Sequence, residues 1–582
     1  MSAFLAPLLR IPAYSRIRRP TAGLALAAFF CAAVGARADG PRDQLLGLVP
    51  PEMEVCLVVS DLREHAKQVA GAGWFKALWQ SPLRGALAEI PEVKRLSQAE
   101  EGMRKHFQVD FARIRDDLFG DAVLFAYRSG PPGQADQEKG LFLLWARDPA
   151  LLERLIDLFN QEQKKNGELK DLEVRTYKTA KYVRRAEKGR TQFYFRDGAL
   201  LAFSSDEELL KKVIDRHVAA KPTEPALAEA FAAWPAKMAL AALWINPRML
   251  DAELEAKAKQ AEGPDAAVLK HLLVYWKALD GIVLTLRAQP DVEVSMALRA
   301  RAEKLPASWR RLIDEAARPS ALWGLFPEKP LLAVVGRLDA KALTESATEF
   351  MTPEARKGFT EAVSRVFSAP LGMDLFEEVL PHLGPEWGAY VGAPVRGEEI
   401  PRVILALQVQ PGPKDAPVDQ ALIKGMQFGA TLAALSYNSS HADQIRLKSV
   451  KQGDVEVKYL SGDKAFPKGL QPAFALKAGY LVVASSPDSV RAFATAPAEP
   501  KKTLGEKPLL RMTLTEWAKI LKAQREPWLQ AMTADGKLSR AAAEQLADGL
   551  MLVMGQFEHL EVNQQIQKGQ VAWTLRLRPL RR

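Results

Sequence analysis

The sequence predicts an α+β protein built from two duplicated units, each an antiparallel sheet of meander and hairpin strands covered by helices on one face. Residues 49–62 hold a proline-marked turn, a short apolar run and a polar switch into a helix, and the same pattern returns at 325–338. The elements after each copy recur in the same order. Solenoid repeats have periods of only ~20–50 residues, so this spacing indicates a duplicated domain.

The first unit is expected to begin with a buried strand at 53–60, with Asp61 as the N-cap of the next helix. Short helices continue to about Phe107. The expected elements that follow are strands at 121–127 and 140–147, a helix at 149–164, a meander at 173–178, 181–187, 190–196 and 199–204, a helix at 206–216, a strand at 237–246 and helices to Lys277. A closing hairpin turns at Gln289-Pro290-Asp291. Its alternating apolar residues, expected to point inward, are Val292, Val294, Met296 and Leu298.

The second unit retraces this path after a helical connector at 301–320. The expected strands lie at 330–337, 386–393, 401–410, 443–451, 454–460, 471–477, 480–485 and 508–515, with a helix at 417–435. In the final hairpin, the expected inward face is Val571, Trp573, Leu575 and Leu577. The predicted domains are therefore a signal peptide at 1–38, a first unit at 39–300, the connector, and a second unit at 321–582.

The N-terminus has the features of a secretory signal peptide. Four arginines and no acidic residue precede an apolar run from Ala22 to Val34, and Ala36-Arg37-Ala38 supplies small residues for cleavage after Ala38. That run is shorter than the ~20 residues needed to span a bilayer, and no transmembrane segment is expected in the mature chain. We therefore expect an exported protein, periplasmic or secreted.

Charge and cysteine content exclude some classes of protein. The net charge falls from +10 to +5 on cleavage, because the signal carries five arginines and no acid. The nearly balanced charge of the mature chain argues against a nucleic-acid partner. Cys56 alone remains after Cys31 leaves with the signal, so no intrachain disulfide is expected, and its place in an apolar strand predicts a buried thiol.

Familiar catalytic and cofactor motifs are missing from the sequence. Its seven histidines are too far apart to share a helix face, so the zinc-protease spacing is absent. Nucleophile-elbow, phosphate-loop and dinucleotide fingerprints are absent too. Ser461-Gly462-Asp463-Lys464 fits a Ser-x-x-Lys spacing, but it lies on a predicted turn without its partner motifs. No residue is assigned a catalytic, cofactor-binding or metal-binding role, and no cofactor is expected.

Other clusters have both a structural and a functional interpretation. The acidic pairs Asp116-Asp117, Glu207-Glu208 and Glu377-Glu378 are interpreted as helix starts or helix surfaces. Arg184, Arg185, Lys188 and Arg190 flank a hairpin turn and suit either solvent or an anionic partner. Two aromatic groups suit either a core or a ligand groove: Trp74, Phe75 and Trp79, and Trp234, Trp244 and Trp276.

The start of the mature chain resembles a family of exported bacterial proteins defined by a domain of unknown function. The shared features are Leu48-Val49-Pro50-Pro51, a strand ending at Asp61-Leu62, and a helix with Trp74-Phe75 before Ser81-Pro82-Leu83. The likeness covers the first ~60 mature residues, and beyond them only the order of elements. The resemblance implies an exported α+β protein and transfers no functional residue.

These observations favour an exported, non-enzymatic binding or scaffold protein of the bacterial cell envelope. Its partner would be an envelope protein, a lipid or a polysaccharide. A second hypothesis is a carrier that holds a hydrophobic, lipid-like ligand, and a third is a hydrolase with a site assembled from distant residues.

Overall fold

The computed structural model describes residues 40–580, apart from 82, 89–90, 132–133, 135–136, 233–235, 396, 413–416, 463, 495–506, 535–537 and 568. The predicted signal peptide and Trp234 therefore lie outside the described residues.

Twenty strands form one sheet, and every pairing in it is antiparallel. The first ten strands are β1 (Val55–Ser60), β2 (Ala122–Arg128), β3 (Lys139–Trp145), β4 (Leu169–Tyr177), β5 (Ala180–Glu187), β6 (Arg190–Asp197), β7 (Leu200–Ser204), β8 (Ala241–Ile245), β9 (Leu279–Arg287) and β10 (Val292–Ala300). The other ten are β11 (Leu332–Arg337), β12 (Leu383–Gly392), β13 (Arg402–Val409), β14 (Arg446–Gln452), β15 (Val455–Ser461), β16 (Ala473–Lys477), β17 (Tyr480–Ala484), β18 (Lys507–Thr513), β19 (Phe557–Gln567) and β20 (Gln570–Pro579).

Helices connect the strand blocks. Those before β11 are α3 (Pro41–Leu48), α4 (Leu62–Gly71), α5 (Gly73–Gln80), α6 (Leu83–Ala88), α7 (Pro91–Phe107), α8 (Phe111–Arg113), α9 (Pro149–Lys165), α10 (Glu207–Val218), α11 (Pro225–Ala232), α12 (Asp251–Gln260), α13 (Gly263–Ala278), α14 (Ala307–Ala316) and α15 (Leu322–Leu325). Those after it are α16 (Ala340–Thr348), α17 (Pro353–Leu371), α18 (Val418–Ser440), α19 (Pro487–Ala492), α20 (Leu514–Ala523), α21 (Arg525–Thr533) and α22 (Arg540–Met554). Short π-helices η1 (Ile114–Leu118) and η6 (Leu375–Val379) precede β2 and β12, and short 3₁₀ turns are η3 (Ala236–Met238), η4 (Pro247–Leu250), η5 (Ala302–Lys304) and η7 (Leu380–His382).

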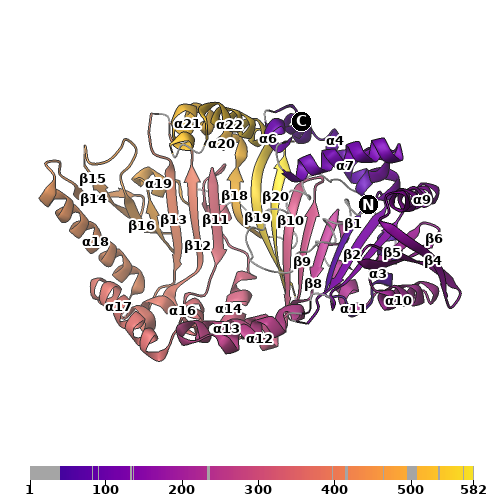
Figure 1. Cartoon of the computed structure of the whole chain (residues 1–582). Coiled ribbons are helices and arrows are strands. Elements are labelled where there is room, and N and C mark those ends of the chain that lie inside the picture. Colours follow the sequence, from indigo (N-terminus) through magenta and orange to yellow (C-terminus); the bar gives the residue numbers. More distant parts are fainter. Residues whose placement is uncertain are drawn as a thin grey trace.

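The strand order is the same on both sides of the central β10–β20 pair. Outward from β10 run β9, β8, β1, β2, β3, β7, β6, β5 and β4. Outward from β20 run β19, β18, β11, β12, β13, β17, β16, β15 and β14. Figure 1 shows the sheet crossing the molecule, with helices gathered beyond both ends of its strands. The α+β class and the antiparallel sheet are confirmed, and one continuous sheet replaces the separate sheets expected.

Helices pack on both faces of the outer sheet, so the expectation of cover on one face is wrong. On β3, Leu141 and Leu143 join a core with α3 and α10, whereas Phe142 and Leu144 join another with α9. Side chains alternate between faces along a strand, so these two cores lie on opposite sides of the sheet. The all-apolar run of β3 reflects burial on both sides.

Asp61 occupies the N-cap position of α4 as expected, but it does not cap the helix in the usual way. Asp61 has a φ of 52°, in the left-handed region, and its side chain makes no capping hydrogen bond. Its backbone N–H instead donates to the Asp121 carbonyl at 2.9 Å. This hydrogen bond to the residue just before β2 shapes the turn. Asp339, at the corresponding place before α16, does cap its helix by accepting from the Ala342 N–H at 2.8 Å.

Candidate functional site

The central strands carry one face made of apolar side chains, which we call the apolar face. Directly opposed residues form an unbroken apolar row across eight strands, from β9 to β13. The row consists of Leu286, Val294, Leu575, Val562, Leu510, Val334, Ala389 and Leu405. Flanking rows add Leu284, Met296 and Trp573 on one side and Val292, Leu577, Leu560, Met512, Leu332, Val391 and Val403 on the other.

The apolar face remains accessible to solvent. Val294, Met296, Leu575 and Leu405 are 37%, 41%, 40% and 47% exposed, and the other members of the three rows are at least partly accessible. Neighbouring strands lie ~4.8 Å apart, so eight strands make the row about 34 Å wide. The three rows extend ~13 Å along the strands, because residues on one face repeat every ~6.6 Å.

On the five central strands the opposite side is polar and largely buried, and we call its charges the charge row; on β11, β12 and β13 the opposite side is instead an apolar core that includes Ala333, Ile404 and Ala406. On β9, β10, β20, β19 and β18 in turn, the charge row contains Arg287, Glu293, Arg576, Glu561 and Arg511. Glu293 accepts from Arg287 and, at 2.6 Å, from Arg576 Nε, and Arg511 Nε donates to Glu561 Oε1 at 2.8 Å. Glu293 and Glu561 are both 3% exposed, so alternating charges neutralise each other inside the protein.

The polar face continues with neutral hydrogen-bonding residues. Ser295 and Thr574 lie opposite each other, 2% and 1% exposed, with their hydroxyls 2.9 Å apart. The prediction that alternate residues of the two closing hairpins point inward is therefore wrong for Val294, Met296 and Leu575, whereas Val292 packs against a buried cluster. Alternating apolar and polar residues identify the two faces of a strand but do not say which face is buried. Here the polar face can be buried because Arg and Glu side chains on neighbouring strands pair with each other.

Helices α4 and α5 cover one margin of the apolar face. Leu62 and Val69 pack there with Trp74 and Phe75 against strand residues that include Leu286 and Val292. The ring centroids of Trp74 and Phe557 also lie 5.9 Å apart. The first aromatic group is thus mostly packing, although Trp79 is 40% exposed and has the Arg84 guanidinium over its ring.

The second aromatic group does not contribute to the apolar face. Trp244 belongs to the first core, and Trp276 donates to Asp251 Oδ1 at 2.9 Å. Trp244 also lines a pocket of about 340 Å³ on the polar side of the sheet, where Arg299 is paired with Glu229. Trp244 and Trp276 therefore line no common pocket in the described residues, and Trp234 lies outside them.

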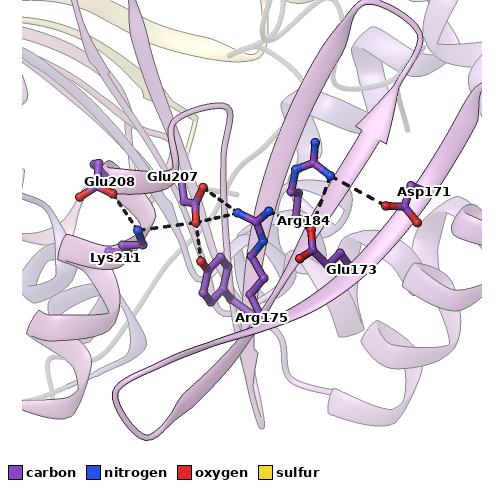
Figure 2. Close-up of polar contacts among 8 residues, drawn as sticks. Asp171, Glu173, Arg175, Arg184, Glu207, Glu208 and Lys211 are labelled. Atoms are coloured by element: carbon purple, nitrogen blue, oxygen red, sulfur yellow. Dashed lines mark hydrogen bonds and ion pairs between the residues drawn. The ribbon is translucent and has the colours of Figure 1, made fainter.

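The three arginines of the basic cluster predicted at the β5–β6 turn are paired with acids, whereas Lys188 has no ion pair among the described residues. Figure 2 shows Arg184 facing Asp171 and Glu173, with nitrogen–oxygen distances of 3.8 and 3.5 Å. Arg185 and Arg190 both contact Glu187. Because these guanidiniums already have carboxylate partners, they favour a role in holding the β4–β5–β6 meander over anion binding.

The same close-up contains one of the acidic pairs. The Glu207 carboxylate accepts hydrogen bonds from the Tyr182 hydroxyl and from Arg175 (Figure 2). Arg175 Nη1 lies 3.1 Å from Glu207 Oε2, and Lys211 Nζ lies 3.6 Å from Glu207 Oε1. These hydrogen bonds hold the pKa of the Glu207 carboxyl below its ordinary value, so it stays an anion. Glu208 pairs with Lys211 at 2.7 Å. The other two pairs, Asp116-Asp117 and Glu377-Glu378, lie in the π-helices η1 and η6.

Groups with strongly shifted pKa values are scattered. Burial raises the pKa of Cys56 in β1 and lowers that of His65 in α4 to about 4. Burial also raises the pKa of Tyr275 in α13 to about 12, and burial with the Glu386 contact raises that of Tyr480 in β17. Within the described residues, no group of three or more His, Cys, Asp or Glu side chains could hold a metal ion.

The Ser-x-x-Lys spacing is only partly visible. Ser461 ends β15 and Lys464 lies in the turn after it, whereas Asp463 lies outside the described residues. The burial of Cys56, predicted from its strand, is confirmed. Across the described ranges, no helix is both long and apolar enough to cross a bilayer.

The apolar face could have been found from the alternation in the two closing hairpins, but its exposure could not. In comparisons with protein-family models, with curated proteins and with solved structures, no match to this chain was found.

Proposed function

We propose that this protein is an exported, non-enzymatic binding protein whose apolar face holds the hydrocarbon chains of a lipid-like amphiphile. The single observation that carries the proposal is the row of opposed apolar side chains across eight strands, which stays accessible while the opposite side of the same strands is largely buried. We also propose that residues 39–300 and 321–582 are duplicated units, because the strand order repeats outward from β10 and β20.

The size of the face supports a ligand of this kind. The largest apolar patch of an ordinary soluble monomer measures ~300–600 Å² and is often functional. An area about 34 Å by 13 Å falls within that range. A hydrocarbon chain occupies about half of the ~30 Å core of a bilayer, roughly 15 Å, so several chains fit side by side on the face.

The chemistry of the face favours hydrocarbon over a protein partner. Protein interfaces typically form ~10 hydrogen bonds, whereas the three apolar rows offer one conventional side-chain hydrogen-bonding group, the indole N–H of Trp573. Each strand from β9 to β13 already has a hydrogen-bonded neighbour on both sides, so its backbone is not free to take up an added strand. Acyl chains require no hydrogen bonds and gain only from leaving water.

The hydrolase hypothesis has less support. A site for acid–base catalysis brings shifted titratable groups together in a cleft. Here, Cys56, His65, Tyr275 and Tyr480 lie on four separate elements. The scaffold hypothesis predicts a bound protein rather than a bound lipid, which the experiment below distinguishes.

The test is native mass spectrometry on mature protein purified from its own cell envelope. We compare the wild type with Val294→Lys/Leu575→Glu, which places opposite charges on directly opposed residues and so preserves the sheet. Val174→Lys, at a 68% exposed position in β4, is the control for an added surface charge. Circular dichroism checks that all three proteins fold.

We expect a discrete lipid-range mass on the wild type and the control, and its loss from the double variant. A bare wild-type chain, or an adduct that persists on the folded double variant, would overturn the proposal. A bound protein in place of the lipid would establish the scaffold hypothesis instead.

A further inference from the structure

Helix α18 presents an apolar stripe to solvent at the β14 end of the molecule (Figure 1). Phe428, Leu432 and Leu435 are 51%, 49% and 61% exposed. Their spacing, with Lys424 one turn earlier, places all four on one side of the helix. The only acidic residue of α18 is Asp419, in its first turn. The exposed stripe therefore contains apolar and basic side chains and no acidic one.

Helix α17 packs beside α18 and has a similar stripe. Phe359, Val366 and Phe367 are exposed, the last two by more than half. The two helices approach closely where the end of α17 meets Gly425, since a Cβ on Gly425 would lie 2.8 Å from Leu371 Cδ2. Two neighbouring helices thus expose large apolar side chains at one end of the sheet.

Basic side chains lie close to these stripes without acidic partners. Arg446, Lys448 and Lys451 lie on β14, which contacts α18, and are all exposed; alternation along the strand places Arg446 and Lys448 on one face and Lys451 on the other. Neither they nor Lys424 form an ion pair within the described residues. This distinguishes them from the arginines of the β5–β6 turn, which are paired with Asp171, Glu173 and Glu187.

We propose that α17 and α18 form a docking surface for the interface of an anionic phospholipid bilayer. Interfacial helices bury an apolar side at the boundary of headgroups and acyl chains, and basic side chains next to it attract anionic headgroups. Lysine stems can extend along the apolar stripe while their charges stay with the headgroups. This inference rests on residues outside the apolar face and does not depend on the proposed function.

A second copy of the chain fits these observations less well. A two-fold interface pairs a surface with itself, so it would bring the unpaired basic side chains of one copy toward those of the other. An anionic bilayer turns the same charges into attraction. The proposal therefore commits to the bilayer, and a dimer is an outcome that the experiment can detect.

The experiment is vesicle flotation of the full mature chain at low and high salt. The vesicles contain phosphatidylcholine alone or phosphatidylcholine with phosphatidylglycerol. Two variants change the surface: Leu432→Ser/Leu435→Ser removes apolar side chains, and Lys424→Glu/Lys451→Glu reverses charge. The matched control is Leu272→Ser/Val274→Ser on α13, where the two residues are 49% and 48% exposed.

We expect the wild type to float with phosphatidylglycerol vesicles, and high salt to weaken this binding. Each surface variant should lower the partition coefficient by about tenfold or more, the effect of losing two interfacial contacts, while the control stays within about twofold. Analytical ultracentrifugation and circular dichroism of the same proteins report oligomeric state and folding.

Equal flotation of the wild type and the folded α18 variant would overturn the proposal, as would a wild type that does not float. A wild-type dimer that the α18 variant dissociates would assign this surface to a second copy. Lipid adducts separate the two proposals: an α18 variant that keeps its adducts but no longer floats leaves the apolar face as the ligand site, and a wild type that floats but carries no adduct leaves only the docking surface.

Discussion

Two adjacent residues of β10 test whether the centre of the sheet buries its polar face. Glu293→Leu removes the carboxylate that holds Arg287 and Arg576, whose side chains are only 21% and 13% exposed. Breaking a buried pair by removing one partner typically costs ~3–5 kcal/mol, because the remaining charges stay desolvated. Val294→Ser, on the apolar face, should cost about 1 kcal/mol, since full burial of a valine contributes only ~1.5–3 kcal/mol and Val294 is 37% exposed.

The assay is chemical denaturation followed by tryptophan fluorescence, with circular dichroism to check that the transitions coincide. Ser295→Ala, which removes one buried hydrogen bond to Thr574, provides an intermediate reference of about 1 kcal/mol. In an ordinary sheet with an apolar core, the valine substitution would be the costly one. If Val294→Ser proves more destabilising than Glu293→Leu, the assignment of the two faces is refuted.

Three further predictions concern single residues. Cys56 should resist thiol reagents at pH 8 in the folded protein and react once it is unfolded, because burial excludes the reagent and raises the pKa of the thiol; labelling followed by intact mass spectrometry checks this. The pKa of His65 is lowered to about 4 by burial, below its unfolded value of ~6.5, so its stabilising contribution is complete above pH ~6.5 and is lost as the pH falls toward 4. Denaturation midpoints of wild type and His65→Leu should therefore diverge in their pH dependence only in that window, and parallel curves would contradict the assignment. Gly336→Ala places a Cβ 2.9 Å from the Trp387 ring, so it should cost about 1–3 kcal/mol in the wild type and much less in a Trp387→Ala background, as a double-mutant cycle would measure.

Element order was largely predictable from the sequence. The run from Val55 to Ser60, the β4–β7 meander and the closing hairpins all form strands near their expected positions. These elements depend on local alternation and turn residues, which a single sequence contains. The α+β class follows from them directly.

The burial of each face could not be predicted in the same way. Alternation marked Val294 and Leu575 as one face, and the residue types suggested that it points inward. Glu293 and Arg576 are 283 positions apart, so only the pairing of β10 with β20 reveals that their charges meet. The candidate binding face could therefore be located from the sequence, but its accessibility depends on contacts between distant segments.

The β10–β20 pair also has a consequence for how the chain reaches its final state. The hydroxyls of Ser295 and Thr574 meet across 279 positions of sequence, so β10 is synthesised long before its partner. Until β20 arrives, β10 presents an unpaired strand edge next to apolar side chains, the arrangement most prone to associate with other chains. Contacts of such long range form slowly. The pairing of β10 with β20 at the centre of the sheet is thus the folding step at which this protein is most prone to associate with other unfolded chains.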